Sequence, residues 1–419
     1  MIWYRASWVL PIEAPPIRDG WVAIERGRIA GVGSGKRPGA IDLGHVAILP
    51  ALVNAHTHLE LSYLRGAVPP AARFLDWIGA IMAARRRVRD TDDPVILQAA
   101  RAGIEEARAS GTGVVGDTGN TLVTVPLLRD AAMPARVFYE LLGFNTDDPA
   151  GRVLEARGHV DRTGGTGADV RVSLAPHAPY SVSPGLFSAL REDLDAHRGD
   201  VSSVHLGESP EEVEFIDRGT GGWRDVLTGL GVWTDAWQAP GVSPVRYLAD
   251  LGFLDSRVLA VHGVQCDGDD LSRLRALGTT VVSCPRSNRY VGVGDPPIEA
   301  FYAMGVTVAF GTDSLASVQD LNMFGELAAA RRLAPRVSAR HLLESATRCG
   351  ARALGFGEQF GSIEEGKQAA LIAVRVPERV DDVEEYLVSG VEPAAITWLD
   401  AEKPQIPNPK SQHHSGTTR

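Results

Sequence analysis

Short apolar runs alternate with longer amphipathic stretches through the middle of the chain. Runs of this length that end at turn-forming residues predict buried strands, and stretches with helical periodicity predict the crossovers between them. The expected strands are Val46–Val53, Gly113–Asp117, Ala135–Leu142, Val170–Ala175, Val201–His205, Val258–His262, Thr280–Cys284 and Val306–Phe310. The expected helices include Ala71–Arg89, Val95–Ala109, Pro184–Leu194 and Asp270–Leu277. Eight strands that each lead into a crossover predict an α/β fold, a (β/α)8 TIM barrel.

The two ends of the chain carry shorter strand patterns. Trp21–Glu25 and Arg28–Val32 flank a turn at Arg26-Gly27, which predicts a hairpin. Near the other end, Ala370–Val376 and Ala395–Leu399 have strand patterns too. Two short β-rich ends around one long middle predict that the ends pair with each other.

These patterns predict three parts. Residues 1–48 plus 353–401 are expected to form a composite β-sandwich domain, and residues 49–352 the barrel. Residues 402–419 offer little to bury and are expected to be a disordered tail.

Charge and composition narrow the class of partner. The net charge of -10 and the pI of about 5.6 disfavour nucleic acid and anionic membranes. No apolar run approaches the ~20 residues of a membrane span, and the N-terminus lacks the order of a signal peptide. The three cysteines are far apart, which favours a reducing compartment. We expect a cytoplasmic protein that acts on a small-molecule substrate. If the protein forms an oligomer, we expect a homodimer.

Histidines gather where the predicted strands end. His56 and His58 are two positions apart on an extended segment, so both side chains point the same way. His177, His205 and His262 end or follow three further strands. Barrel enzymes carry their chemistry at these carboxyl ends. A single such histidine is typical of a hydrogen-bonded structural residue, but five of the eleven histidines at strand ends favour a site.

The residue types predict a mononuclear metal centre. His56, His58, His205 and Asp313 offer three nitrogens and one carboxylate, a set that suits zinc or ferrous iron. Such an ion lowers the pKa of a bound water to ~7 and so supplies a nucleophile at neutral pH. The only lysines are Lys36, Lys367, Lys403 and Lys410, all outside the predicted barrel. A two-metal site bridged by a modified barrel lysine is therefore excluded.

Three residues are candidates for proton transfer. Glu208 follows His205 by three positions and can take a proton from water and pass it to a leaving group. The alternative is a helix-start glutamate stabilised by the helix dipole. His262 is a candidate for orienting the nucleophile, and Asp313 for accepting the proton of water in addition to binding the metal.

With these residues in place, the chain resembles the amidohydrolase superfamily, in the branch of purine and pterin deaminases and related chlorohydrolases. The motifs that carry the resemblance are Asp19 to Ile24, Asn54 to His58, Ala175 to Tyr180, His205-x-x-Glu208, Val261-His262-Gly263, Gly311 to Ser314 and Gly361 to Lys367. The resemblance implies one metal ion, Glu208 as proton shuttle, and His262 and Asp313 beside the nucleophile. It also implies that His177 contacts the substrate.

Two segments narrow the resemblance within that branch. His58 to Ser62, which includes Glu60, and Ser283 to Asn288 look like the aminodeoxyfutalosine deaminases of menaquinone synthesis. Arg286 would suit the benzoate carboxylate of that substrate, because a guanidinium binds carboxylates bidentately. Arg289, Arg65 and Arg73 stay open as alternatives, and Asn288 and Glu60 are further candidate substrate contacts.

We therefore predict a metal-dependent hydrolytic deaminase of a 6-aminopurine nucleoside, with 6-aminodeoxyfutalosine as the preferred candidate substrate. The alternative substrates are S-adenosylhomocysteine, methylthioadenosine and adenosine. Deamination of guanine and chlorohydrolysis are less favoured alternative reactions. A catalytically inactive barrel used as a binding scaffold is the hypothesis from another class. Such a scaffold would be expected to have lost a metal ligand or the shuttle acid, and this chain keeps all of them.

Overall fold

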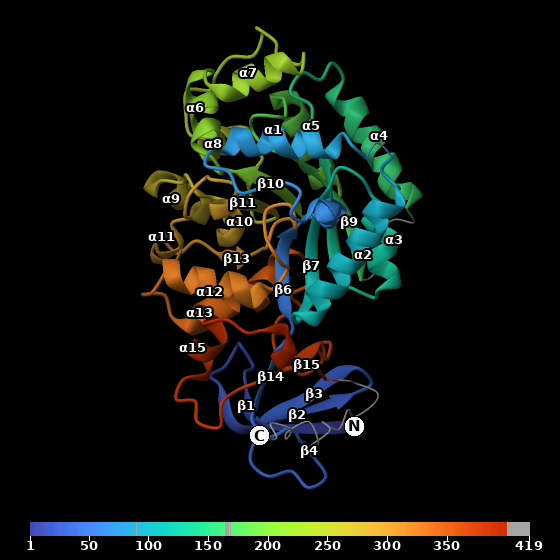
Figure 1. Ribbon diagram of the computed structural model, residues 1–419, viewed down its shortest axis with the longest axis vertical. Coiled ribbons are helices and arrows are strands. Elements are labelled where there is room, and N and C mark those ends of the chain that lie inside the picture. Colours follow the sequence, from blue (N-terminus) through green and yellow to red (C-terminus); the bar gives the residue numbers. More distant parts are fainter. Residues whose placement is uncertain (89, 164–166, 168, 400–419) are drawn as a thin grey trace, which may run out of the picture.

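The computed structural model describes residues 1–88, 90–163, 167 and 169–399. Arg89, the predicted end of the first helix, and the predicted tail 402–419 lie outside the described residues. Two four-stranded parallel sheets form the upper part of the molecule in Figure 1, and a seven-stranded sheet lies below them. The chain is therefore an α/β protein, as predicted.

The first parallel sheet has the order β6 (Leu52–Thr57), β7 (Thr112–Gly119), β8 (Ala135–Leu141) and β9 (Val170–Pro176). The second has the order β10 (Ser202–Leu206), β11 (Val258–His262), β12 (Thr280–Ser283) and β13 (Val308–Phe310). Backbone hydrogen bonds also join the two sheets. The N–H of His205 donates to the O of His177 (2.9 Å), and the N–H of Asp313 donates to the O of His56 (3.0 Å). The outer strand β9 of the first sheet thus meets β10 of the second, and β6 of the first meets β13 of the second.

The prediction of a single strand over Val46–Val53 is wrong. The segment forms two strands, because the chain changes partners at Ala51. β5 (Val46–Pro50) pairs with β1 (Ile2–Val9) and with β14 (Leu371–Arg375), whereas β6 pairs with β7. The N–H of Ala51 donates to Ala370, and that of the next residue, Leu52, to Gly111. A continuous apolar run conceals this change, since both strands are buried.

The lower sheet contains strands from both ends of the chain. The order is β15 (Ile396–Trp398), β14, β5, β1, β2 (Ile17–Glu25) and β3 (Arg28–Ser34), and β4 (Ile41–Asp42) pairs with β1. The predicted hairpin is present, and its turn residues Arg26 and Gly27 have φ angles of 51° and 75°. Such angles suit the tight turns that match the twist of paired strands.

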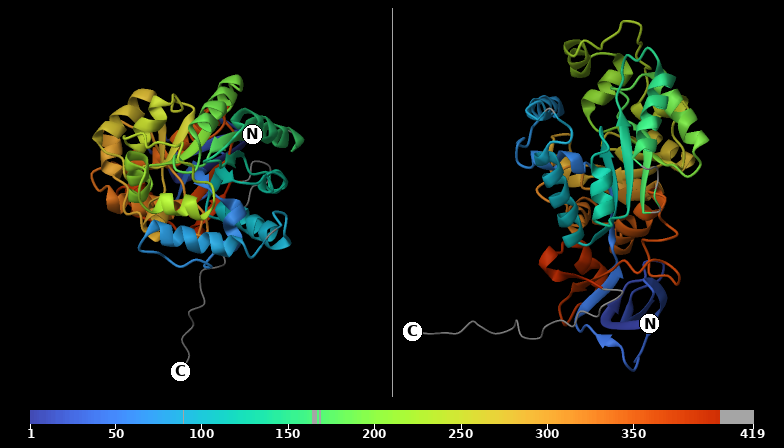
Figure 2. Two further views of the ribbon diagram at one scale, coloured as in Figure 1. Left: turned by 90° about the horizontal axis from the view of Figure 1, so that it is seen from above. Right: turned by 90° about the vertical axis from the view of Figure 1, so that its right-hand side faces the viewer.

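Helices surround the parallel strands (Figure 2, left). They are α1 (Phe74–Arg85), α2 (Pro94–Ala109), α3 (Thr124–Asp130), α4 (Pro149–Arg162), α5 (Pro184–Ala196), α6 (Pro210–Arg218), α7 (Gly222–Gly229), α8 (Pro244–Asp250), α9 (Gly268–Leu277), α10 (Pro285–Tyr290), α11 (Ile298–Ala303), α12 (Met323–Leu333), α13 (Ala339–Glu344), α14 (Gly350–Ala353) and α15 (Val383–Val388). Several start with proline behind an N-cap Asp or Ser that accepts a backbone N–H, as at Ser183 and Ser209. None of the helices in the described part of the chain has the length and apolar character that a bilayer span requires.

Gly311 controls how closely β13 approaches β6. A Cβ atom at Gly311 would lie 2.7 Å from the backbone O of His56 and 2.8 Å from its N. We expect Gly311→Ala to lower the free energy of unfolding by about 1–3 kcal/mol, because overpacked backbone must shift. Chemical denaturation measures the change. Gly268→Ala is the matched control, since a Cβ there meets nothing within 4 Å; an equal loss in both variants would contradict the prediction.

Candidate active site

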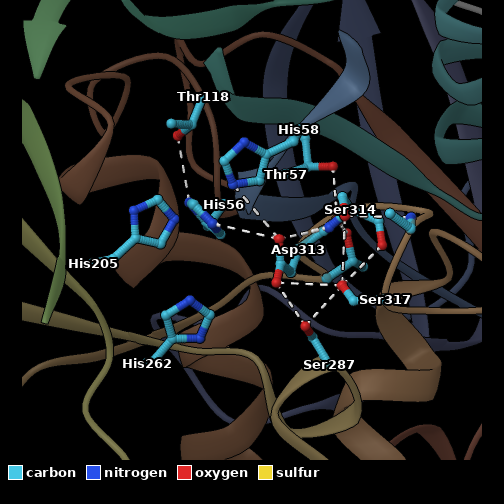
Figure 3. Close-up of polar contacts among 12 residues, drawn as sticks. His56, Thr57, His58, Thr118, His205, His262, Ser287, Asp313, Ser314 and Ser317 are labelled. Carbon is cyan, nitrogen blue, oxygen red and sulfur yellow. Dashed lines mark hydrogen bonds and ion pairs between the residues drawn. The ribbon is translucent and has the colours of Figure 1, made fainter. Parts of the chain in front are cut away.

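Three imidazoles and one carboxylate meet at the carboxyl ends of the parallel strands (Figure 3). His56 lies in β6, His58 follows it, His205 lies in β10, and Asp313 follows β13. The ligand nitrogens of the three histidines all lie within 4.8 Å of one another. The Oδ1 of Asp313 lies 3.8 Å from Nε2 of His56 and 3.6 Å from Nε2 of His58. The four predicted metal ligands are therefore brought together.

The orientation of the rings leaves nitrogens free to bind a cation. His205 Nδ1 lies 3.0 Å from the carbonyl O of His177, which can only accept, so Nδ1 carries the proton and Nε2 is left free. His56 Nδ1 contacts the hydroxyl of Thr118 at 3.4 Å. His56 Nε2 is buried without a hydrogen-bond partner among the described residues. Buried polar atoms are normally satisfied, so this orphaned nitrogen and its neighbours fit a divalent zinc or iron ion.

Asp313 is held in a strained backbone conformation. Its φ angle is 61°, in the left-handed region that non-glycine residues rarely adopt. The hydroxyl of Ser287 donates to Oδ2 (2.6 Å), and the N–H of Ser314 donates to Oδ1 (2.7 Å). Burial alone would raise the pKa of Asp313, but His58, His262 and the Ser287 hydroxyl outweigh it and hold the pKa below its ordinary value. The carboxylate is thus fixed in its charged form.

Glu208 and His262 stand beside this cluster. The Oε1 of Glu208 lies 3.5 Å from Nε2 of His262, and His262 Nδ1 lies 2.8 Å from Oδ1 of Asn288. Burial raises the pKa of Glu208 to about 8, and burial lowers the pKa of His262 to about 3. A protonated acid therefore faces a neutral imidazole at neutral pH, an arrangement that can donate a proton to a reacting group.

A cavity of about 750 Å³ opens above the cluster. One wall is apolar and comes mainly from α1, with Phe74, Trp77, Ile78 and Ile81, while Trp223 faces them from α7. The predicted site residues that line the cavity are His58, Glu60, His177, His205, Glu208, His262 and Asp313. His56 has no exposed surface and belongs to the buried floor. The cavity can thus take a molecule with one polar and one apolar end.

Three predicted substrate contacts do not lie on the cavity wall. Arg286 points to α12, where its Nε donates to Oε1 of the buried Glu326 (2.6 Å), and it also pairs with Asp320. Arg289 pairs with Asp295 at the surface. Asn288 is fully buried and contacts His262. α10 directs these side chains to other protein groups, so none of the three lines the cavity in which the prediction would place the substrate.

Glu60 lines the cavity as predicted, but its carboxylate also holds a neighbouring loop. It accepts the backbone N–H of Asn120 at Oε1 (3.0 Å) and that of Thr121 at Oε2 (3.1 Å). The Nδ2 of Asn120 donates to Oε2 of Glu140 (2.9 Å), and Oε1 of Glu140 lies 3.3 Å from Nδ1 of His205. A chain of polar contacts thus joins the cavity wall to a predicted metal ligand.

The polar cavity residues that the sequence analysis did not single out include Arg85, Asn120, Glu140 and Arg152. Asn120 follows β7 and Glu140 lies near the end of β8, so inspection of every strand end would have found both. Arg85 belongs to a run of arginines typical of a solvated helix face, and Arg152 lies on α4. No sequence signal distinguishes these two from other surface arginines.

Comparison with known proteins agrees with this geometry. The Amidohydrolase family pattern matches residues 47–396. Aminodeoxyfutalosine deaminase of Deinococcus radiodurans is 35% identical over 321 residues, 74% of this chain and 73% of that protein. 5-Methylthioadenosine/S-adenosylhomocysteine deaminase of Moorella thermoacetica is 31% identical over 401 residues, 91% of this chain and 88% of that protein.

Among solved structures, an adenosine deaminase from Xanthomonas campestris with bound zinc superposes with a TM-score of 0.82 at 28% identity. The match covers 96% of this chain and 92% of that one. The family pattern and the relatives span most of the chain, and the residues that the family pattern matches include the strands that carry the histidine cluster. The chain is a hydrolytic enzyme that belongs to the amidohydrolase family.

Proposed function

We propose that this protein is a metal-dependent hydrolytic deaminase of a 6-aminopurine nucleoside, with 6-aminodeoxyfutalosine as the first-choice substrate. The observation that carries the proposal is the cluster of three histidines and Asp313, with the protonated acid Glu208 beside it at the floor of a large cavity. The names of the three relatives described above, each of them a deaminase, support the same chemistry.

The proposal includes the architecture that carries the site. The hydrogen bonds between the outer strands of the two parallel sheets support an eight-stranded (β/α)8 barrel closed at both seams. The sheet from both chain ends encloses its own core of Tyr4, Val22, Ile48 and Leu371, which supports a small β-sandwich. The boundaries proposed are residues 49–352 for the barrel and 1–48 plus 353–401 for the sandwich, as far as these residues are described.

His56, His58, His205 and Asp313 would hold the ion, zinc or iron. When bound, the ion supplies the activation of water that makes a nucleophile available at neutral pH. Water adds to the carbon that bears the amino group, and Glu208 protonates the adjacent ring nitrogen. The Glu208 carboxylate then takes a proton from the added water and passes it to the amino group, which leaves as ammonia. His262 stays neutral and faces Glu208. His177, whose Nδ1 contacts the Ser181 hydroxyl at 2.6 Å, would contact the purine.

The choice of substrate rests on the far end of the cavity. Its aromatic and aliphatic wall suits a nucleoside with an apolar extension, and its cations are Arg85 and Arg152. Arg85 already donates to Oδ1 of Asn120 (3.2 Å), whereas the Arg152 guanidinium makes no hydrogen bond or ion pair with the described residues. A free guanidinium suits any carboxylate, and the apolar wall beside it suits the aromatic ring of the benzoate of aminodeoxyfutalosine better than the charged amino-acid end of S-adenosylhomocysteine. S-adenosylhomocysteine, methylthioadenosine and adenosine are the second candidates, because the curated relatives include deaminases of the first two.

Glu208→Gln should keep the metal and lose turnover. The amide cannot donate and reclaim the proton, so ammonia release should fall by about 10²–10⁴-fold, the usual contribution of a positioned acid or base. Stopped assays of ammonia release, with metal content measured on the same sample, check this. Turnover within a factor of two of the parent would remove Glu208 from the mechanism.

Chelation should abolish ammonia release, because three imidazoles and one carboxylate do not themselves activate water. Zinc or ferrous iron added back should restore the activity, and the ion that restores more of it identifies the native metal. His205→Ala should bind less than about one tenth of the parent's metal, since each ligand contributes strongly to affinity. An apoprotein that deaminates at the parent's rate would refute the metal assignment.

Arg152→Met should discriminate between substrates. Loss of a charge-assisted hydrogen bond to a carboxylate costs about 1.5–3 kcal/mol. We therefore expect kcat/KM for aminodeoxyfutalosine to fall about 10- to 100-fold, with methylthioadenosine, which has no carboxylate, changed less than about twofold. A parallel loss for both substrates would mean that Arg152 supports the fold. An unchanged value for both, with Arg85→Met selective instead, would move the carboxylate contact to Arg85.

A further inference from the structure

Glu212, in the first turn of α6, has no exposed surface although it is an acid. Its carboxylate turns back along the chain. The N–H of Gly207 donates to Oε1 (2.9 Å), and the N–H of Glu208 donates to Oε2 (2.8 Å). Each carboxylate oxygen thus binds one backbone amide of the segment that carries the proposed proton shuttle.

This arrangement differs from an ordinary helix cap. In the usual capping box the acid at the third helical position accepts the N–H of the N-cap residue itself. Here Ser209 is the N-cap, and its hydroxyl accepts the N–H of Glu212 (3.2 Å) as expected. The Glu212 carboxylate instead reaches one and two residues further back. These two hydrogen bonds do not cap the N–H groups of α6 itself, so they stabilise the segment before the helix, Gly207 and Glu208.

The opposite side of the same segment is held by the loop after β11. The N–H of Gln265 donates to the O of Gly207 (2.8 Å), and the N–H of Gly263 donates to the O of Leu206 (3.1 Å). Gly207 has a φ angle of 62°, which glycine adopts without strain. The amides of the turn are therefore fixed by Glu212 and its carbonyls by the neighbouring strand end.

We infer that Glu212 is a positioning residue, which holds the backbone of Glu208 so that the Glu208 carboxyl points at His262 and the reacting atoms. The inference rests on the proposed role of Glu208. A carboxylate is suited to this task because it only accepts hydrogen bonds, and both partners are donors. A glutamine would present its NH₂ group to one of the two N–H groups, so one bond would be lost at nearly constant shape.

The test compares Glu212→Gln with Glu211→Gln. Glu211 is the adjacent residue on the same helix, it does not line the cavity, and its Oε2 has no hydrogen-bond partner in the described part of the chain. Both acids act on the Glu208 carboxyl through their charge. A purely electrostatic effect would therefore appear in both variants, and an effect of the two hydrogen bonds only in Glu212→Gln.

Two readouts are needed, one of them independent of turnover. Hydrogen–deuterium exchange should show the Gly207 and Glu208 amides exchanging about tenfold faster or more in Glu212→Gln and unchanged in Glu211→Gln. For ammonia release, kcat should fall about 10- to 100-fold in Glu212→Gln, because small displacements of a catalytic group are costly. KM and metal content should stay within about twofold of the parent in both variants.

The outcomes separate the two hypotheses. Unchanged exchange in Glu212→Gln, or faster exchange with parental kcat, would overturn the inference. An equal fall of kcat in both variants would assign the effect to charge and would also overturn it. If the parent protein releases no ammonia from any aminopurine nucleoside, the proposed function fails, and the exchange result alone then decides whether Glu212 holds the turn.

Discussion

The backbone contact between β13 and β6 is the interaction on which the site depends. The N–H of Asp313 donates to the O of His56, and Gly311 allows the two strands to approach because a side chain there would collide with His56. This contact brings the Asp313 carboxylate to the first histidine pair, from which it is distant in the sequence. Without it, three imidazoles would remain, and the fourth proposed ligand and its negative charge would be absent.

The candidate site contains backbone conformations and buried polar groups that are energetically unfavourable. His262 and Asp313 are two of the few non-glycine residues with positive φ in the described chain, and such conformations cost about 1–3 kcal/mol each. Several acids and histidines are also buried together, which is unfavourable unless each has a partner. Ser287 supplies such a partner to Asp313 and Asn288 to His262, while the buried Glu212 finds its own in two backbone N–H groups. The surrounding helices are therefore part of the site, although none of these three side chains lies on the cavity wall.

The sequence predicts the parts of the molecule that a local pattern determines. Each parallel strand is a short apolar run, and histidines stand at the ends of β6, β9, β10 and β11 on the same edge, so the candidate metal ligands could be named in advance. The change of partner at Ala51 could not, because β5 and β6 are both buried and apolar. The environment of Arg286 could not be predicted from the sequence either. Its partner Glu326 is distant in the sequence, and the packing of α10 against α12 brings the guanidinium to that acid and away from the cavity.

The residues proposed for the reaction and those proposed for substrate choice also differ in whether a local sequence pattern or long-range packing determines their position. The groups proposed to react come from strand ends, whose positions are fixed by the hydrogen bonds of the sheets. The groups proposed to recognise the far end of the substrate, such as Trp77, Arg85 and Arg152, come from α1 and α4, which take no part in the hydrogen bonds of the sheets. Helices of this kind can change their exposed residues without disturbing the proposed metal ligands. Relatives with different named substrates at about 30% identity are what such an arrangement permits, and the residues that distinguish them should be sought on these helices rather than at the strand ends.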